Sequence, residues 1–335
     1  MGVAATGSER DAYEVGRVTA LEGRAVGIHI TFAPVADVNN NPANPIINTR
    51  SFGENPQLVG VLVAAAIRGL QENGMLATAK HFPGHGDTDV DSHISMPVMK
   101  GDWSRLSNLE LQPFRSAINA GVALVMSAHI AMPGLTGDST LPATLSPEVL
   151  TGLLRDSLHF KGVAVTDALG MGGIVNRYGA GEAAVLALIA GADLLLQPAD
   201  PETALDAVTA AVESGRISQE RINESLRRIL TMKSQLGLLD RRSVQLERVP
   251  EVVGRAEFLA VARDIARRSI VLVNDSGSVV DSLRARRRPI SARRLRRREH
   301  AHRGQPARRP APGRGISREH LPVVAGERSR ELRLG

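Results

Sequence analysis

The sequence predicts an α/β fold built on parallel strands, of the (β/α)8 TIM-barrel kind, from three observations. Short apolar runs alternate with amphipathic helical stretches, which is the pattern of repeated β–α units. Each apolar run ends in a polar residue, as expected where parallel strands collect chemistry at their carboxyl ends. No glycine-rich phosphate-binding loop follows any of the runs, which disfavours the nucleotide-binding α/β folds.

The apolar runs predict five strands, at residues 28–38, 75–82, 123–130, 162–169 and 192–198. The polar residues near their ends are Asp37, Lys80, His81, His129, Asp167 and Gln197. Five strands are too few for an eight-stranded barrel, and the chain opens with a helical pattern rather than a strand. We therefore expect a barrel that lacks its first strand or strands.

Three of the intervening helices carry clear start signals. Asn55-Pro56 opens a helix that Gly74 closes, and Ser146 caps another whose first turn holds Pro147. A third, long and amphipathic, starts from Ser218 and runs to about residue 239.

The formal net charge of +6 does not indicate a nucleic-acid-binding protein. The positive charge is concentrated in the Arg/Pro-rich residues 284–314, whereas acids and bases are interspersed before them. Basic arms of this kind can bind nucleic acid, but this one has no periodicity and no interleaved aromatic residues. We expect residues 281–335 to form a disordered tail, and we expect no nucleic-acid partner.

Composition also bounds the ligand and the compartment. The chain contains no cysteine, which excludes disulfides and thiolate chemistry. Only 3% of residues are aromatic, and Trp103 is the single tryptophan, so a small ligand is favoured over a long polysaccharide. No apolar run reaches the roughly 20 residues that cross a bilayer, and the N-terminus does not resemble a signal peptide. A cytoplasmic monomer is the default expectation.

The densest cluster of chemically active residues is KHFPGHGDTDVDSH, residues 80–93. Histidines and aspartates in such a loop could bind zinc or manganese, or could perform acid/base work. Asp91 and His93 are two residues apart, so an extended loop would direct both side chains to the same side. A carboxylate there would orient the imidazole and raise its proton affinity.

Two further segments are candidates for the same site. Asp167 in VTDALGM follows a strand and could be a nucleophile, a metal ligand or a helix cap. The Asn/Pro-rich residues 32–56 carry many amides and the conspicuous Arg50, which suit sugar hydroxyls and an acyl carbonyl. A purely structural loop, in which Arg50 pairs with a surface acid, is the alternative.

Taken together, the segments resemble glycoside hydrolase family 3, specifically its β-N-acetylglucosaminidase branch. The resemblance covers roughly residues 1–275 and is carried by a series of motifs in a fixed order: FAPVADV, RSFGENP, KHFPGHGDTDVDSH, MSAHI, VTDALGM and AGADLLLQP. It implies Asp167 as nucleophile and His93 as acid/base, assisted by Asp91. It further implies substrate binding by Arg50, Lys80 and His81. Asp37 and His129, at the ends of their predicted strands, are candidates for the same role.

The resemblance implies a retaining exo-glycosidase for terminal β-linked N-acetylhexosamine, with a small carbohydrate as its partner and no metal or cofactor. It divides the chain into an incomplete barrel over residues 1–245 and a linker with the start of a second α/β domain over 246–280. The tail follows over 281–335. A β-glucosidase of the same family and an inactive remnant that only binds sugar remain as alternatives.

Overall fold

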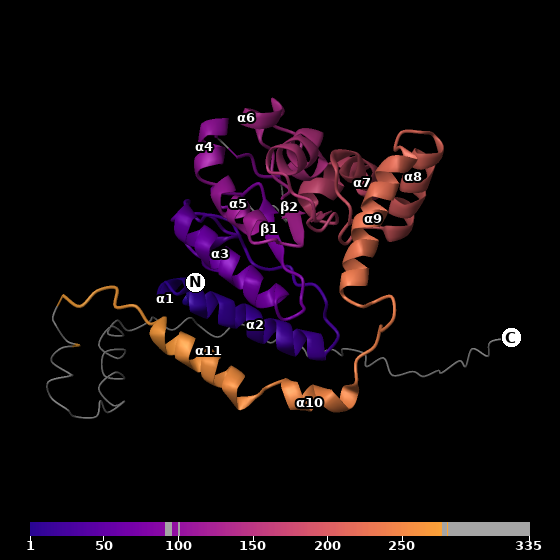
Figure 1. Cartoon of the computed structure of the whole chain (residues 1–335). Helices are drawn as coiled ribbons and strands as arrows, with labels where there is room; N and C mark the ends of the chain where they lie inside the picture. The colour runs from indigo at the N-terminus through magenta and orange to yellow at the C-terminus, as the bar shows by residue number, and fades with distance from the viewer. Residues whose placement is uncertain (91–95, 100, 277–279, 281–335) are drawn as a thin grey trace, which may run out of the picture. The chain divides into compact units, whose positions relative to one another are not determined.

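The computed structural model describes residues 1–90, 96–99, 101–276 and 280. Its first compact unit spans Met1–Leu272 (Figure 1), and of the second, Val273–Gly335, only residues 273–276 and 280 are described. The predicted disordered tail, residues 281–335, thus lies outside the described residues.

The elements follow one another as a mixed α/β chain (Figure 1). Its first half contains α1 (Gly2–Thr6), α2 (Glu9–Ala25), η1 (Asn48–Arg50), α3 (Pro56–Gln71), β1 (Thr78–Phe82), α4 (Trp103–Asn108), α5 (Leu111–Asn119), β2 (Leu124–Ser127), α6 (Pro133–Thr136) and η2 (Ala143–Leu145). Its second half contains η3 (Glu148–Ser157), β3 (Val163–Val165), α7 (Gly172–Ala190), α8 (Pro201–Glu213), α9 (Gln219–Gln235), η4 (Leu246–Arg248), α10 (Val249–Val252) and α11 (Ala256–Arg268).

The three strands form one parallel sheet in the order β1-β2-β3. The other two predicted strands lie along its edges. Ile30 and Val35 make parallel bridges to Leu76 and Lys80, and Leu194 makes one to Val165. The five predicted segments therefore run side by side in sequence order, as the sequence predicts, although only three are regular strands. Closure into a barrel stays a prediction.

The predicted helix starts are confirmed by their caps. Asn55 accepts a hydrogen bond from the Leu58 amide at the start of α3, and Ser218 accepts one from the Arg221 amide at the start of α9. The helix after Ser146 differs from the α-helix its pattern suggests, because η3 is a π-helix. In a π-helix each amide donates to the carbonyl five residues earlier, as the Leu158 amide does to the Leu153 carbonyl at 2.9 Å.

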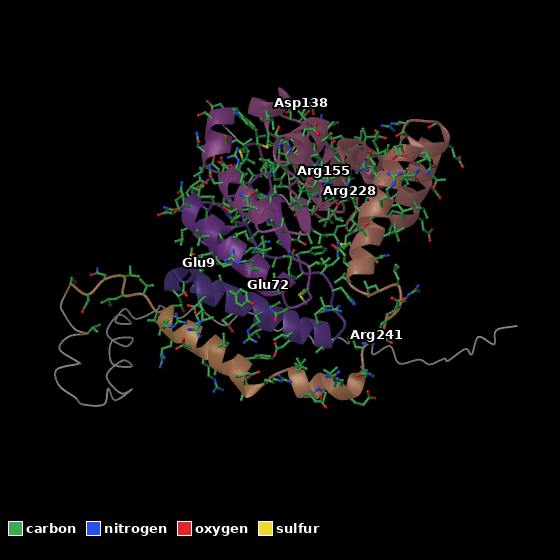
Figure 2. All side chains as sticks on the ribbon, viewed as in Figure 1. Glu9, Glu72, Asp138, Arg155, Arg228 and Arg241 are labelled. Atoms are coloured by element: carbon green, nitrogen blue, oxygen red, sulfur yellow. The ribbon has the colours of Figure 1, made fainter. Side chains whose placement is uncertain are left out.

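Small residues let α2 and α3 pack backbone against backbone. A Cβ atom on Gly69 would lie 2.1 Å from the Tyr13 carbonyl oxygen, and one on Gly16 would lie 2.5 Å from that of Ala66. On the exposed side of this contact the Tyr13 hydroxyl donates to Glu72 at 2.8 Å (Figure 2). Phe82 of β1 and Phe114 of α5 are buried in the hydrophobic core, where their rings meet edge to face.

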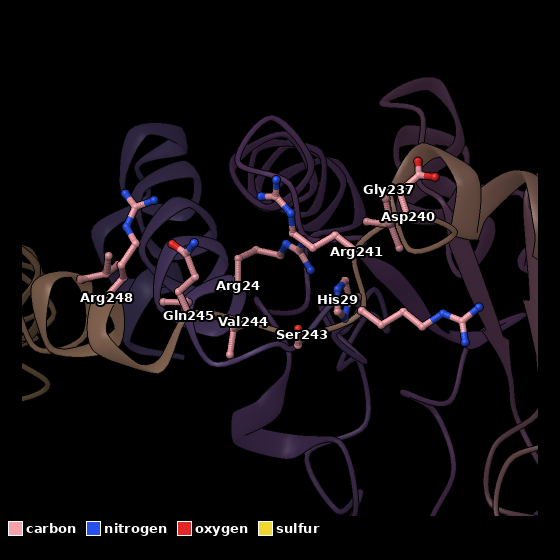
Figure 3. A pocket seen from close by; sticks show the side chains of 13 residues that line it. Arg24, His29, Gly237, Asp240, Arg241, Ser243, Val244, Gln245 and Arg248 are labelled. Atoms are coloured by element: carbon pink, nitrogen blue, oxygen red, sulfur yellow. The ribbon is translucent and has the colours of Figure 1, made fainter.

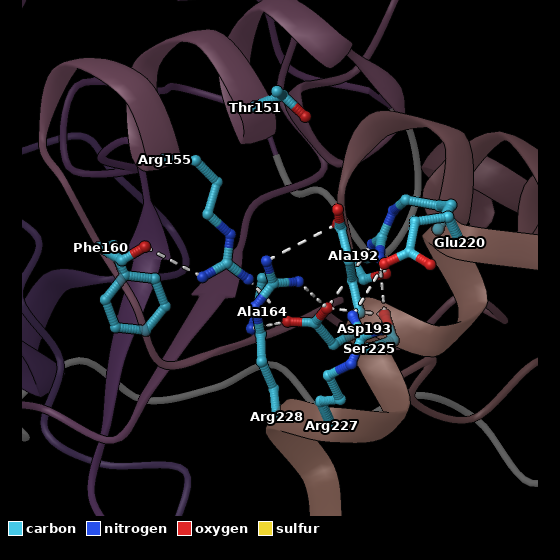
Figure 4. Close-up of polar contacts among 12 residues, drawn as sticks. Thr151, Arg155, Phe160, Ala164, Ala192, Asp193, Glu220, Ser225, Arg227 and Arg228 are labelled. Atoms are coloured by element: carbon cyan, nitrogen blue, oxygen red, sulfur yellow. Dashed lines mark hydrogen bonds and ion pairs between the residues drawn. The ribbon is translucent and has the colours of Figure 1, made fainter.

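Asp193 lies near the start of the last sheet segment, residues 192–198. It is a buried carboxylate that pairs with three arginines (Figure 4). Arg155 lies 2.6 Å from it, Arg228 2.9 Å and Arg221 3.5 Å. The Ala164 amide of β3 donates to the same carboxylate at 2.9 Å. One acid thereby connects η3, β3 and α9.

Helices α10 and α11 pack on the N-terminal helices of the same unit. Arg268 of α11 donates two hydrogen bonds to the Asp11 carboxylate of α2, at 2.6 and 2.7 Å. Among the helices that the structure describes, none combines the length and apolar character needed to span a membrane.

Candidate active site

Five predicted site residues lie in or just after the carboxyl-terminal parts of neighbouring parallel segments: Asp37, Lys80, His81, His129 and Asp167. Carboxyl ends of parallel strands meet at one edge of a sheet. Arg50, at the end of η1, joins them through its contact with His81. The fold thus brings all six described candidates to one edge.

Asp37 is the buried centre of this edge. Its carboxylate has no exposed surface and accepts hydrogen bonds from the His81 amide at 3.1 Å and the His81 Nδ1 at 2.7 Å. The His85 amide donates to it at 2.7 Å. Among the described residues, Asp37 is connected to Arg50 through His81, and its predicted substrate-binding role stays a prediction.

The ionisation of Asp37 follows from these contacts. Burial opposes the charged form, but the His81 imidazole and the hydrogen bonds from His81 and His85 together hold the pKa of Asp37 below its ordinary value. A permanent negative charge therefore lies beneath the turn at residues 81–85 and fixes its two backbone amides.

His81 connects Asp37 to Arg50. Its Nε2 lies 3.3 Å from Arg50 Nη2, and a guanidinium can only donate. His81 Nε2 must therefore accept, which places the ring hydrogen on Nδ1, where it is donated to Asp37. The resulting carboxylate–imidazole–guanidinium chain orients the exposed Arg50 side chain from within the protein.

The charges that act on Lys80 are those of Arg50, Asp167 and Asp37. Burial and the charge of Arg50 lower the pKa of Lys80, while the carboxylates of Asp167 and Asp37 act in the opposite direction. Lys80 is therefore close enough to Asp167 for their charges to interact.

Asp167 follows β3 without being a helix cap, since α7 begins only at Gly172. Its Oδ1 accepts a hydrogen bond from the Ala168 amide at 2.8 Å. Among the described residues no hydrogen bond reaches Oδ2. The backbone therefore holds one of the two carboxylate oxygens.

His129, predicted to bind substrate, is buried behind Asp167 rather than displayed beside it. Only 1% of the residue is exposed. Its Nδ1 lies 2.8 Å from the Thr144 hydroxyl, and its Nε2 lies 2.9 Å from the Ala168 carbonyl oxygen. The contact with Ala168 joins the end of β2 to the residue that follows Asp167.

The loop after Lys80–His81 is held by residues that the sequence does not single out. Asn44 donates from Nδ2 to the His85 carbonyl at 2.8 Å. Asp87 accepts from Asn40 at 2.9 Å and pairs with Arg105 at 2.9 Å. The amide-rich composition of residues 32–56 was the available signal for the two asparagines. No sequence pattern indicates Arg105, which comes from α4.

His85 shapes this loop as a neutral side chain. Burial, together with weaker repulsion from His81, lowers its pKa to about 4. A histidine whose pKa is depressed on folding binds its proton more tightly in the unfolded chain. Its stabilising contribution is thus complete above the unfolded pKa of about 6.5 and is lost as the pH falls toward 4.

We therefore predict that the free energy of unfolding decreases from pH 6.5 to pH 4, and that His85→Asn removes part of this decrease. Asparagine keeps a polar atom near Nδ1, which lies 2.7 Å from the Thr88 hydroxyl. Denaturant titrations at several pH values measure the slope. His159→Asn, at an exposed position with positive φ, is the matched control and should keep it. An unchanged slope in His85→Asn would contradict the assignment.

Asp91 and His93 lie outside the described residues, so their predicted roles remain predictions. The same holds for the metal-binding alternative for residues 80–93, to which both belong. Within the described part of the chain, no three histidine, aspartate or glutamate side chains are grouped so that they could hold a metal ion.

A cavity of about 510 Å³ lies elsewhere and is separate from this edge (Figure 3). It is lined by His29, Arg24, the end of α9 and residues 240–245, together with Arg248. None of the predicted site residues lines it. His29 lies at the start of the segment 28–38, whose far end carries Asp37, so the cavity belongs to the amino-terminal ends of the strands.

Comparison with known proteins identifies the family. Residues 1–232 match the N-terminal domain of glycosyl hydrolase family 3. The chain belongs to this family. The resemblance inferred from the motifs is thereby confirmed, and the family 3 domain covers every described residue of the candidate site.

Individual relatives agree with this assignment. The β-hexosaminidase A of Pseudoalteromonas piscicida is 34% identical over 285 residues, 79% of this chain and 47% of the relative. A solved family 3 β-N-acetylglucosaminidase from Paenibacillus sp. str. FPU-7 is 45% identical, with a TM-score of 0.79 over 83% of this chain and 53% of that one.

A second solved structure, the β-glucoside phosphorylase BglX bound to 2FGlc, has the same TM-score of 0.79 at 34% identity. It matches 83% of this chain and 52% of its own. The family 3 chain thus spans about half the length of the relatives it matches. These neighbours support a glycoside-active domain.

Proposed function

We propose that the chain is the catalytic domain of a retaining exo-glycosidase that removes terminal β-linked N-acetylhexosamine, chiefly N-acetylglucosamine. Peptidoglycan fragments or chitooligosaccharides would supply such ends. The observation that carries the proposal is the placement of Asp167 and Lys80 toward the carboxyl ends of strands of one parallel sheet, in a chain 45% identical to a β-N-acetylglucosaminidase. We further propose that the sheet is part of a (β/α)8 barrel over residues 1–245.

In the first step Asp167 Oδ2 attacks the anomeric carbon of the bound sugar. The bond from that carbon to the leaving oxygen breaks, and His93 donates a proton to that oxygen. Asp91 would support the charged imidazole. Retaining glycosidases ordinarily use two carboxylates, so in this proposal a His–Asp pair replaces the second one.

In the second step water attacks the anomeric carbon of the glycosyl-enzyme, and His93 removes the water proton. The bond to Asp167 breaks, which restores the carboxylate and gives a product of retained configuration. Lys80 and Arg50 would hold sugar hydroxyls through both steps, with Arg50 oriented by His81 and Asp37.

The assay is hydrolysis of p-nitrophenyl N-acetyl-β-glucosaminide by the purified chain, with the β-glucoside in parallel and a chelator as control. We expect turnover of the N-acetyl substrate that resists chelation. Turnover lost on chelation would instead favour the metal alternative for residues 80–93. A folded chain that turns over neither substrate would leave sugar binding as its function and would contradict the proposal.

A second candidate is action on β-glucosides with phosphate as the acceptor. The similarity to a β-glucoside phosphorylase favours it, and so do the cations Arg50 and Lys80, which would attract a phosphate dianion. A phosphate oxygen would attack the glycosyl-enzyme in place of water, releasing sugar 1-phosphate and the Asp167 carboxylate. Phosphate-dependent turnover with sugar 1-phosphate as product would select this candidate, and turnover indifferent to phosphate would reject it.

A further inference from the structure

The hydrogen bonds of His129 show which ring nitrogen must carry a hydrogen. The Ala168 carbonyl oxygen, 2.9 Å from Nε2, can only accept. Nε2 must therefore carry a hydrogen. The partner of Nδ1 is the Thr144 hydroxyl oxygen, at 2.8 Å.

Thr144 is itself fixed. Its residue is fully buried, and its oxygen lies 2.9 Å from the Ser127 hydroxyl, which can donate to it in turn. The Thr144 hydroxyl donates to the Ala128 carbonyl oxygen, also at 2.9 Å. Ser127 ends β2 and Thr144 is the middle residue of η2, so the ring is held by two separate elements.

Ala168 is the point where this chain reaches the carboxylate. His129 binds its carbonyl, and its own amide donates to Asp167 Oδ1 at 2.8 Å. Two further hydrogen bonds fix the following residues: the Leu169 amide donates to the Leu196 carbonyl and the Gly170 amide to that of Gln197, each at 2.9 Å. Among the described residues, the contact that holds the Ala168 peptide from the β2 side is the one with His129.

We propose that His129 is a positioning residue for the nucleophile. Its Nε2 hydrogen fixes the Ala168 peptide, whose amide in turn holds Oδ1 of Asp167, so that Oδ2 faces the anomeric carbon. His129 acts from behind the carboxylate and not on the sugar. The inference rests on the proposed function of Asp167, but its hydrogen-bond pattern can be tested without turnover.

The kinetic test compares His129→Leu with His129→Gln. Leucine removes the donor, and displacement of a reacting group by about 1 Å can cost about 100-fold in rate. We expect His129→Leu to lower the rate of glycosyl-enzyme formation by about 10- to 100-fold with little change in KM. Glutamine, whose amide can donate to Ala168, should recover most of that rate. His29→Gln, outside the site, is the matched control.

A merely structural role would lower stability and leave the rate per folded molecule intact, and this result would overturn the proposal. So would equal rates for the leucine and glutamine variants. If His129→Leu does not fold, Thr144→Val and Thr144→Ser replace it. Loss of the hydroxyl should then slow glycosyl-enzyme formation, and serine should restore it; equal rates for this pair would contradict the proposal.

The tautomer is measured independently by the ¹⁵N chemical shifts of the ring, assigned by the signal that disappears in His129→Gln. We expect a hydrogen on Nε2 at neutral pH. A hydrogen on Nδ1 alone would refute the inference, whatever the activity of the chain. Conversely, the expected tautomer in a chain without turnover would leave the hydrogen-bond arrangement correct and the proposed function wrong.

Discussion

Replacing Asp167 by asparagine is expected to lower kcat by roughly a thousandfold or more, because the amide cannot form the covalent intermediate. The substitution is nearly isosteric, and asparagine Oδ1 can still accept from the Ala168 amide, which now donates to the carboxylate at 2.8 Å. Stability should therefore change little. Steady-state kinetics with p-nitrophenyl N-acetyl-β-glucosaminide measure the effect.

Asp156→Asn is the matched control, since Asp156 is exposed on η3. It should hydrolyse the substrate at the wild-type rate. Equal activity of Asp167→Asn and wild type would exclude Asp167 as the nucleophile. The carboxylates within residues 80–93 would then be the next candidates.

Replacing Asp193 by alanine is expected to destabilise the domain by about 3–5 kcal/mol, the usual cost of removing one partner from a buried ion pair. Three guanidinium groups would lose their common acceptor. Burial and repulsion from Arg221 and Arg228 already lower the pKa of Arg155 to about 10, against the attraction of Asp193. Without the carboxylate, Arg155 keeps its hydrogen bonds to the Phe160 and Gly162 carbonyls but loses its counter-charge.

Denaturant unfolding of the purified variant measures this effect, with Asp206→Ala, an exposed carboxylate on α8, as the control. The control should unfold near the wild-type midpoint. A change below about 1 kcal/mol in Asp193→Ala, the size typical of a surface ion pair, would show that the arginines find water or other acceptors.

The sequence predicted the order and direction of the sheet segments well because the information is local. Each apolar run is bounded by turn residues, and helix starts such as Asn55-Pro56 satisfy their own backbone amides. The edge segments were harder, since residues 28–38 contain a cis Ala33–Pro34 bond and pair only through isolated bridges.

The sequence also indicated which residues gather at this end of the sheet, but not how deeply each side chain is buried. Asp37 and His129 read as ligand-binding residues because they end strands, yet both are buried. Whether a strand-end side chain faces the ligand or lies behind it depends on partners far away in sequence. His81 and Thr144 are such partners. The residues that flank Asp37 or His129 in the sequence do not indicate them.

The π-helix after Ser146 and the pairing of Arg105 with Asp87 were unpredictable for the same reason. Helical periodicity does not distinguish a π-helix from an α-helix over ten residues. Arg105 approaches the loop only because α4 packs beside α5. Local pattern specifies the elements, whereas tertiary packing selects their partners.

The central claim is that Asp167 forms a covalent bond to the anomeric carbon of an N-acetylhexosamine. The most direct measurement is peptide mass spectrometry of the chain after incubation with a fluorinated N-acetylglucosaminyl fluoride, which forms the glycosyl-enzyme faster than water releases it. We expect one added glycosyl group, located on Asp167 and absent from Asp167→Asn. An adduct on another residue, or hydrolysis of the reagent with no adduct, would contradict the claim.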